Sequence, residues 1–334
     1  MAKDATRDAF SRFRVSNPYT LFDSKQIFDN APLFWNDVQV SGSGTTSTHS
    51  ANRASSTLQV TASTAGRRVR QTKRWFNYQP GKFMQIMMTG IVGATPSGIT
   101  KRIGYFNDDN GIFFEIADNT WYVVIRSNVS GSPVDTRISS SQWNGVDKFI
   151  PNLSRPQIFV IDFEWLGVGE VRWGFVNEGE IKYVHRRDHA NRNSTSSVYM
   201  SSPNLPLRYE IINDGTGVGS NLEAICSTVI SEGGQEQNGL LFSQDTGATD
   251  LVASTSGVIY PLIGMRLKTT HLGATIVNLS ASMLGNSTND PFLWRVYFNP
   301  TIVGTFTFAD LDGSALQIAR TSGTIATTIT SASS

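Results

Sequence analysis

The chain has 334 residues, of which 39% are hydrophobic, so it is long enough for two ordinary domains and apolar enough to form a packed core. Its 28 Lys and Arg residues almost balance its 27 Asp and Glu residues, which excludes the strong positive field that draws proteins to nucleic acids or acidic membranes. A single cysteine excludes an intrachain disulfide and a cysteine-rich metal site.

The first 40 residues carry many large apolar side chains in no regular pattern. They fit neither the helical period of 3.6 nor the strand period of 2, and Pro18 and Pro32 interrupt any regular element. We therefore expect residues 1–40 to form an extended N-terminal docking arm with aromatic anchors. The expected anchoring residues, with the arginines pairing to carboxylates of a partner, are Phe10, Arg12, Phe13, Arg14, Tyr19 and Phe22.

The start of the chain also bears on where the protein is made. MAKDATRDAF is charged and lacks the apolar core of a signal peptide. No run of residues approaches the 18 apolar residues that a membrane span needs. We expect a protein that is made in a cytoplasm and has no membrane partner.

From about residue 57 to residue 231 the chain contains one short strand pattern after another, each bounded by Gly, Asn, Asp or Pro. Two-residue turns at 118–119 and 178–179 separate consecutive strands and predict antiparallel hairpins. No convincing amphipathic helix of twelve or more residues is present. The sequence predicts an all-β protein whose main body, residues 41–234, is an antiparallel β-sandwich or jelly-roll-like domain.

The body also contains a basic run and the single cysteine of the chain. The basic run RRVRQTKRWF at 67–76 places Arg68, Arg70 and Arg74 on one side of a strand, which we expect to be solvated or to face another subunit. Cys226 lies in LEAICSTVIS, where we expect a small apolar core residue rather than a nucleophile.

The polar, Gly-rich passage SEGGQEQNG at 231–239 is the best candidate for a domain boundary. Beyond it, residues 235–334 predict a smaller C-terminal β-region with a Ser/Thr-rich tail, although its strands could instead complete the first sandwich. Strands are expected in GVIYPLIGMRLK, ATIVNLSASML and FLWRVYFN. The last residues, TSGTIATTITSASS, predict either a frayed tail or a strand given to a neighbouring chain.

The stretch VIDFEWLG, residues 160–167, resembles the active-site strand of the laminarinase-type glycosidases, in which Glu, Asp and Glu alternate with apolar residues. The resemblance implies that the first Glu is the nucleophile and the last the acid/base. Here Val160 stands at the nucleophile position and Glu164 at the acid/base position, with Asp162 between them. Because a retaining glycosidase needs both carboxyls, we expect no catalysis and interpret the two acids as polar residues of a half-exposed strand face.

Other candidate sites are equally incomplete. His185 and His189 have a spacing that can bind zinc on a helix, but they follow a strand and are surrounded by arginines, which favours a surface loop. The aromatic residues that could stack on sugars, but whose place within strands favours a core role, are Trp121, Tyr122, Trp143, Trp165 and Trp173. We expect no enzyme activity, no cofactor and no metal.

Four stretches resemble a family of virion structural proteins of tailed bacteriophages. They are DAFSRFRVSNPYTLFDSKQIFDN at 8–30, FVIDFEWLGVGEVRWGFV, SSPNLPLRYEI and CSTVISEGG, and the resemblance runs from the N-terminus to about residue 267. It implies a particle component without enzymatic activity. It does not indicate whether that component belongs to the capsid, the neck or the tail.

These observations predict a non-enzymatic virion protein, assembled in the host bacterial cytoplasm, that docks by its arm onto capsid, neck or tail as a decoration or appendage. Its expected partners are other virion proteins and copies of itself, with no nucleic acid. One alternative is an appendage that binds a glycan, such as a host-receptor sugar. A remote alternative is a laminarinase-like glycoside hydrolase that has lost its nucleophile.

Overall fold

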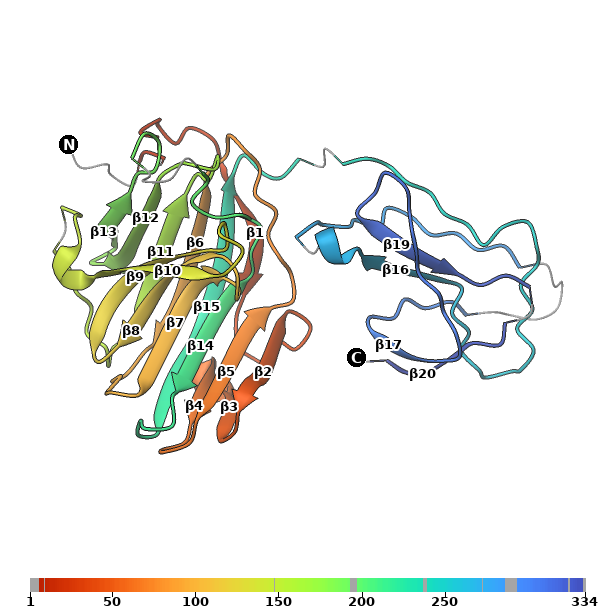
Figure 1. The fold of residues 1–334 in the computed structure, drawn as a ribbon, viewed down its shortest axis with the longest axis horizontal. Coiled ribbons are helices and arrows are strands. Elements are labelled where there is room, and N and C mark those ends of the chain that lie inside the picture. Colours follow the sequence, from red (N-terminus) through yellow and green to blue (C-terminus); the bar gives the residue numbers. More distant parts are fainter. Residues whose placement is uncertain are drawn as a thin grey trace. The chain divides into compact units, whose positions relative to one another are not determined.

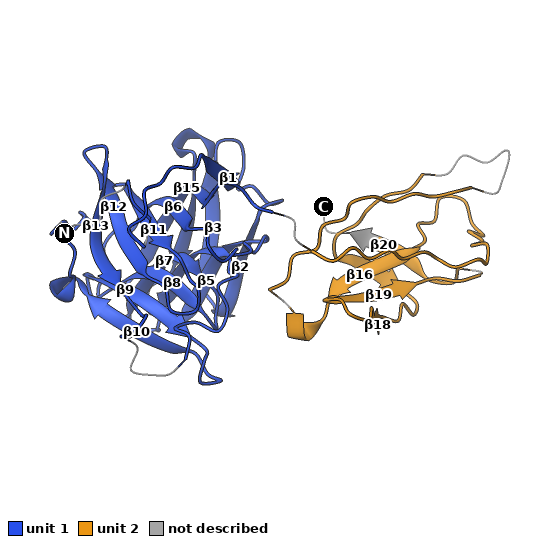
Figure 2. Cartoon of the chain, turned by 90° about the horizontal axis from the view of Figure 1, so that it is seen from above, with its two compact units in different colours: residues 1–236 blue, residues 237–334 orange. Residues whose placement is uncertain are grey.

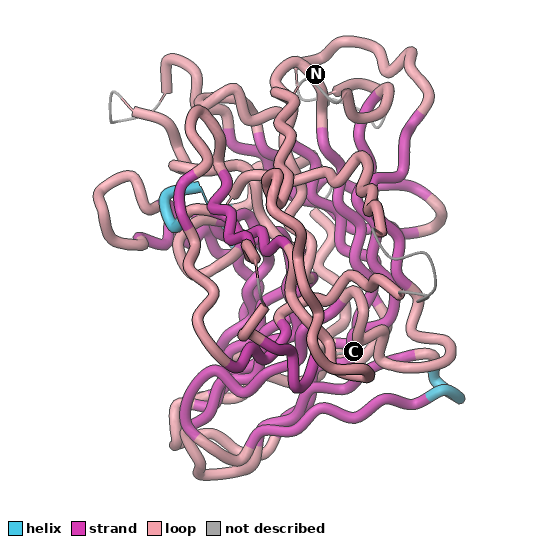
Figure 3. Tube along the Cα trace, turned by 90° about the vertical axis from the view of Figure 1, so that its right-hand side faces the viewer, coloured by secondary structure: helices cyan, strands magenta, loops and turns pink. Residues whose placement is uncertain are grey.

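The computed structural model describes residues 6–8, 10–146, 148–192, 197–236, 239–271, 273–285, 293–323 and 325–332. These residues form strands and loops, with short 3-10 helices at Ala51–Arg53, Ser140–Gln142 and Thr269–His271 (Figure 3). None of the helices in the described ranges is long and apolar enough to cross a membrane. The chain divides into two compact units, residues 1–236 and residues 237–334 (Figure 2).

The first unit is a sandwich of two antiparallel sheets (Figure 1). The larger sheet has the order β13-β12-β11-β6-β15-β4-β3, with β1 also paired to β15. Its strands are β1 Pro18–Ser24, β3 Thr45–Ser50, β4 Ser55–Val60, β6 Met84–Ile91, β11 Gln157–Phe163, β12 Val171–Asn177, β13 Glu180–Arg187 and β15 Ser220–Glu232. The predicted antiparallel β-sandwich is therefore confirmed.

The smaller sheet of this sandwich has the order β10-β9-β8-β7-β14-β5-β2. Its strands are β2 Trp35–Gly42, β5 Gly66–Thr72, β7 Ile99–Phe106, β8 Gly111–Ala117, β9 Thr120–Ser127, β10 Val134–Ser139 and β14 Leu207–Asn213. Strands β7 to β10 pair in chain order, as short hairpin connections require, whereas β14, β5 and β2 pair with strands distant in sequence.

One hydrophobic core lies between the sheets and fixes which side chains point outward. Ile161 and Phe163 of β11 face this core, as do Tyr209 and Ile211 of β14. Because successive strand side chains point to opposite faces, Asp162 belongs to the outer face of the larger sheet. The core role predicted for tryptophans is confirmed for Trp121, Trp143 and Trp173, whereas Trp165 is only partly buried.

The two predicted hairpin turns are confirmed. Asp118 and Asn119 join β8 to β9 with φ of +49° and +55°, and Glu178 and Gly179 join β12 to β13 with φ of +53° and +80°. Positive φ at both central residues matches the right-handed twist of the flanking strands, which is why Asn, Asp and Gly suit these turns.

The first 40 residues do not form a separate arm, and this prediction is wrong from Pro18 onward. β1 pairs with β15 inside the larger sheet, and β2 pairs with β5 at the edge of the smaller one. The ring of Phe22 packs against the rings of Trp35 and Phe76, with centroids 6.1 and 5.4 Å away. Both strands contain a register shift, so the alternation that reveals a strand is broken in the sequence.

Arg70 of β5 holds the connection between β1 and β2 from the inside. Its side chain is fully buried and lies over the ring of Trp35. One guanidinium nitrogen donates to Asp37 Oδ2 at 3.0 Å, and the other donates to Gln26 Oε1 at 2.7 Å and to the Asn30 carbonyl at 2.6 Å. A single buried cation thereby fixes the loop of residues 25–34 to the sandwich.

The prediction that this arginine face is solvated or faces another subunit is wrong for Arg70 and Arg68, which are largely covered within the chain, whereas Arg74 is exposed. Besides the buried Arg70, Arg68 Nε donates to Asp37 Oδ1 at 2.9 Å, and Arg74 Nη1 donates to the Leu21 carbonyl at 2.7 Å. All three arginines are used within the chain. Near the sheet edge, this side of β5 meets polar groups of residues 21–37 instead of water.

Cys226 is exposed, so its predicted core role is wrong as well. The pairing of β15 with β6 shifts register between Ala224 and Ser227. Such a bulge re-aims the side chains beside it, and it leaves Cys226 on the outside.

The second unit has fewer and shorter strands. One sheet joins β16 Ile263–Leu267, β19 Leu316–Arg320 and β18 Ala309–Asp310, and another joins β17 Pro300–Val303 and β20 Thr328–Ala332. Of the three predicted strands, only GVIYPLIGMRLK contains one, and the described residues of the other two stretches contain none. The prediction that the C-terminal segment is a frayed tail or a strand given to a neighbouring chain is also wrong, because β20 pairs with β17 of the same chain.

We predict that Arg70→Ala lowers the free energy of unfolding by about 3 kcal/mol, because it removes the buried guanidinium that binds Asp37, Gln26 and the Asn30 carbonyl. Urea denaturation of the two proteins measures the difference. Arg155 is exposed, so Arg155→Ala is the matched control, with an expected change below about 0.5 kcal/mol. An Arg70 variant as stable as this control would contradict the anchoring role.

Candidate functional site

Two carboxylates lie on the outer face of the larger sheet. Asp162 is in β11 and Glu164 directly follows that strand, and neither residue has exposed surface. Their interpretation as polar residues of a half-exposed strand face is therefore wrong. Val160, at the position of a glycosidase nucleophile, is also fully buried.

The described residues between 6 and 14 fold back on themselves and form what we call the N-terminal hairpin. Arg7 and Phe13 form an antiparallel bridge, and the Arg14 amide donates to the Thr6 carbonyl at 2.9 Å. Asp8 Oδ1 accepts the backbone amides of Phe10 and Arg12 at 2.9 and 2.8 Å. The hairpin satisfies much of its own backbone, so its arginine side chains are free to bind the body.

Asp162 is the first anchor of this hairpin. Its Oδ2 atom accepts an ion pair from Arg14, and it accepts hydrogen bonds from Arg172 Nη2 and from the Tyr183 hydroxyl, both at 2.7 Å. Arg172 also donates to the Arg7 carbonyl at 2.9 Å. Three donors on one oxygen hold Asp162 as a structural ion between β12, β13 and the hairpin.

Glu164 is the second anchor. Arg12 Nη2 donates to both of its carboxylate oxygens, at 3.0 and 3.1 Å, while Arg12 Nε pairs with Asp8. Burial, and then the negative charge of Asp8, raise the pKa of Glu164 to about 7. The pKa of Asp8 is lowered, because its hydrogen bonds to Arg12 outweigh its burial. Arg12 therefore stabilises the charged form of Asp8 more than that of Glu164, although it binds both carboxylates.

The predicted arginine contacts thus fall within the chain. Arg12 pairs with Glu164 and Arg14 with Asp162 of the same chain. Phe22 is buried in its own core, so its prediction as a partner contact is wrong.

The other three predicted anchors, Phe10, Phe13 and Tyr19, are exposed, with 40%, 62% and 55% of their surface accessible. Their contact with a partner stays a prediction. The sequence showed that these rings are numerous, but it did not show which of them the body already covers.

The loop between β1 and β2, residues 25–34, presents an apolar surface that the sequence did not separate from the rest of the arm. We call it the apolar loop. Phe28, Leu33 and Phe34 are 91%, 73% and 54% exposed. The loop is nevertheless fixed, because Arg70 binds it from inside and the amides of Phe34 and Trp35 both donate to the Ala31 carbonyl. It holds large apolar side chains in solvent on an ordered backbone.

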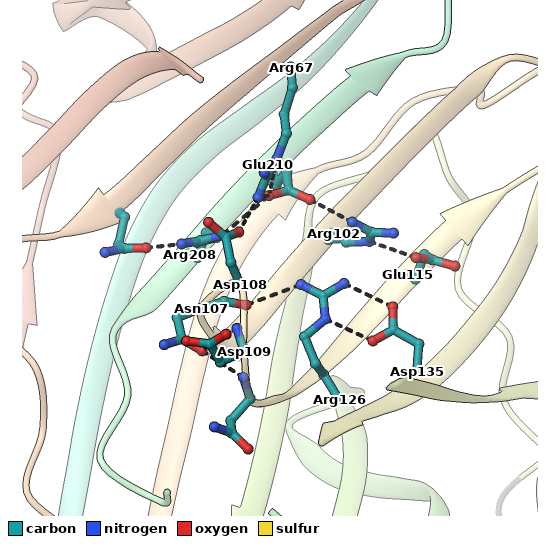
Figure 4. A network of polar contacts seen from close by, with 12 residues as sticks. Arg67, Arg102, Asn107, Asp108, Asp109, Glu115, Arg126, Asp135, Arg208 and Glu210 are labelled. Atoms are coloured by element: carbon teal, nitrogen blue, oxygen red, sulfur yellow. Dashed lines mark hydrogen bonds and ion pairs between the residues drawn. The ribbon is translucent and has the colours of Figure 1, made fainter. Parts of the chain in front are cut away.

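A second charged cluster covers the outer face of the smaller sheet (Figure 4). Fully buried Glu210 accepts hydrogen bonds from Arg67 Nε at 3.0 Å, Arg102 Nη1 at 2.7 Å and Arg208 Nη1 at 3.4 Å. Burial opposes the charge of Glu210, but the three arginines outweigh it and lower its pKa. Arg102 also donates to Glu115 at 2.6 Å, which links β14 to β7 and β8.

Beside this cluster lies a shallow hollow of about 300 Å³, lined by Arg67, Arg102, Asp108, Arg126, Pro133, Asp135 and Ile212. Arg126 donates to both oxygens of Asp135, at 2.7 and 2.8 Å, and Asp108 pairs with Arg67 and Arg208. Each of these arginines faces a carboxylate, so little positive charge remains to attract a phosphate or a nucleic acid.

The histidines predicted to lie in a surface loop are buried. The ring of His185 packs 5.7 Å from that of Trp173, and the ring of His189 stacks on that of Tyr199 at 4.0 Å while a ring nitrogen contacts the Gly169 carbonyl. The surface-loop prediction is wrong because β13 continues to Arg187 and carries His185 into the sheet. Within the described ranges, no group of three or more His, Cys, Asp or Glu could hold a metal ion.

No protein-family model matches the chain, and no curated protein sequence matches it. Solved structures with some likeness include a glycoside hydrolase family protein from Mycobacterium thermorestibile (13% identity, TM-score 0.45), covering 63% of this chain and 99% of that one. Another is the pseudo beta-1,3-glucanase of Mycobacterium tuberculosis (12%, TM-score 0.44; 65% and 99%). A third is the CBM2 module of the evolved Dit of Lactobacillus casei BL23 phage J-1 (8%, TM-score 0.43; 66% and 99%). At such low identities and scores, none of their activities or ligands transfers to this chain.

We predict that Glu164→Gln changes how stability depends on pH. The pKa of Glu164 is about 7 in the folded protein and has an ordinary value of 4.5, so its contribution to stability is fully present below about pH 4.5 and is lost as the pH rises through 7. Glutamine does not ionise, so this loss is absent in the variant. Between pH 4.5 and pH 8 its free energy of unfolding should therefore rise, relative to that of the parent, by up to about 3 kcal/mol.

Denaturation at several pH values measures this difference. Glu178→Gln, at an exposed turn carboxylate, is the control and should leave the profile unchanged. If the free energies of unfolding of the parent and of Glu164→Gln depend on pH in the same way, the raised pKa of Glu164 is refuted.

Proposed function

We propose that this chain is a non-enzymatic structural protein of a tailed-bacteriophage virion, which docks onto other virion proteins through the apolar surface of its first 40 residues. The observation that carries the proposal is the apolar loop. Phe28 and Leu33 are 91% and 73% exposed, yet the backbone between them is tied to buried Arg70 through the Asn30 carbonyl. Large apolar side chains in such positions mark protein interaction sites.

The energetics of docking favour this arrangement. Each large apolar side chain that becomes buried contributes roughly 1.5 to 3 kcal/mol before ordering costs are subtracted. The apolar loop is already ordered by Arg70 and by the Ala31 carbonyl, so little backbone entropy is left to lose. Exposed Phe10, Phe13 and Tyr19 add aromatic surface from the same end of the chain. The resemblance of residues 8–30 to phage virion proteins supports the same role.

The carboxylates of β11 support the non-enzymatic part of the proposal. Asp162 and Glu164 are buried under the N-terminal hairpin and neutralised by Arg14 and Arg12, and Val160 stands where a nucleophile would be needed. The same residues that would form half of a glycosidase site serve to hold the hairpin.

The glycan-binding alternative has less support. Three of the tryptophans that could stack on sugar rings, Trp121, Trp143 and Trp173, are packed in the core of the sandwich. Tyr122 is partly covered by the guanidinium of Arg137, which lies 4.1 Å above its ring centre. Trp165 is partly buried, with its ring 6.2 Å from that of Tyr78, so each of these five rings is at least partly engaged within the protein.

We predict that the double variant Phe28→Asp, Leu33→Asp folds normally but no longer enters phage particles, because charges on the apolar loop oppose burial against a partner. Immunoblotting of purified particles measures incorporation, and urea denaturation checks the fold. Deletion of residues 2–35 is unsuitable, because it also removes β1 and Trp35 from the core.

The matched control is Ile150→Asp, Val218→Asp, which places the same charges at exposed apolar side chains elsewhere on the first unit. This control should be incorporated like the parent. Normal incorporation of the loop variant, or equal loss in both variants, would reject docking through the apolar loop.

A further inference from the structure

The second unit has almost no hydrophobic core of its own. Among its described residues, the buried hydrophobic side chains are those of Ile318, Ala319 and Ile325, whereas the first unit buries 44. Seventeen large apolar side chains among the described residues of the second unit are exposed. The barest are Leu240, Leu241, Leu284, Leu293 and Phe298, each at least 76% accessible.

This exposure is incompatible with a unit that is stable as a single copy. A domain of roughly 100 residues must remove most of its unfolded surface from water to offset the conformational entropy lost on folding. The exposed apolar side chains amount to on the order of 1,500 Å² if a fully exposed large side chain offers about 150 Å². A standard interface needs only about 800 Å² from each partner. The exposed apolar surface of the second unit is therefore large enough to form an interface.

The strands of the second unit lead to the same conclusion. β17 pairs only with β20 as a strand, and β16, β19 and β18 form a sheet in which β18 has two residues. Isolated sheets of two or three short strands are marginal in water, and their edges offer unpaired backbone groups to another chain.

The charges of the unit indicate what covers it. Residues 237–334 contain four basic residues (Arg266, Lys268, Arg295, Arg320) and five acidic ones (Asp245, Asp250, Asp290, Asp310, Asp312), so the net charge is 4 − 5 = −1. This balance provides neither attraction to a strongly charged partner nor repulsion between identical units. A second copy always brings the same apolar surface and free edges in equal number.

We propose that the second unit, residues 237–334, completes its hydrophobic core by associating with the same unit of further copies of this chain. The interface uses the exposed apolar side chains between Leu240 and Val303. This self-association goes beyond the docking role proposed for the apolar loop and does not depend on it.

The test uses the full-length chain and the triple variant Leu241→Asp, Leu279→Asp, Val296→Asp, whose parent side chains are 80%, 65% and 64% exposed. Light scattering after size-exclusion chromatography should give an oligomer for the parent and the mass of one chain for the variant. Trypsin should then cut the variant within its second unit, at sites such as Arg266, while the first unit stays folded.

The control triple variant, Ala253→Asp, Ser256→Asp, Ser282→Asp, adds the same charges at exposed small residues and should remain an oligomer. The apolar-loop variant should also remain one. A monomeric parent with a protease-resistant second unit would overturn the proposal. A triple variant that keeps its oligomeric mass would also overturn it. Loss of the oligomer in the apolar-loop variant instead would overturn it too, because it would place self-association in the first unit.

Discussion

The pairing of buried carboxylates with arginines is the interaction on which the first unit depends outside its hydrophobic core. Asp162 binds Arg14 and Arg172, Glu210 binds Arg67, Arg102 and Arg208, and Asp37 binds Arg68 and Arg70. The Asp162 set joins the N-terminal hairpin to the larger sheet, and the Glu210 and Asp37 sets join neighbouring strands of the smaller sheet. A carboxylate buried without its cation would be costly, so these pairs specify where the segments must lie.

This use of charge also explains why Asp162 and Glu164 are not open to solvent. In a cleft, the acids of VIDFEW would face substrate and water. Here Arg12 and Arg14 of the same chain take that place, and the hairpin that carries them leaves Phe10 and Phe13 facing outward. The face that carries Asp162 and Glu164 is an attachment point for the hairpin, whose outer side exposes Phe10 and Phe13.

The sequence predicted those features whose signals are local. The turns at Asp118-Asn119 and Glu178-Gly179 were found because residue type and φ are linked within two positions. β1 and β2 were missed because bulges interrupt their alternation, and the burial of Asp162 was missed because the residues that cover it are about 150 positions away. The exposure of Cys226 depends on a bulge, which composition does not reveal. Local rules thus gave the fold class, and long-range pairing decided the site.

The pairing of β1 with β15 also sets the order in which this protein can be made. Thr20 meets Ile230 in the finished sheet, so β1 has no strand partner until about two hundred further residues have been synthesised. Contacts of such wide separation slow folding and leave apolar segments uncovered in the meantime. The nascent chain must therefore carry Leu21 and Phe22 without their final strand partner until β15 has been synthesised.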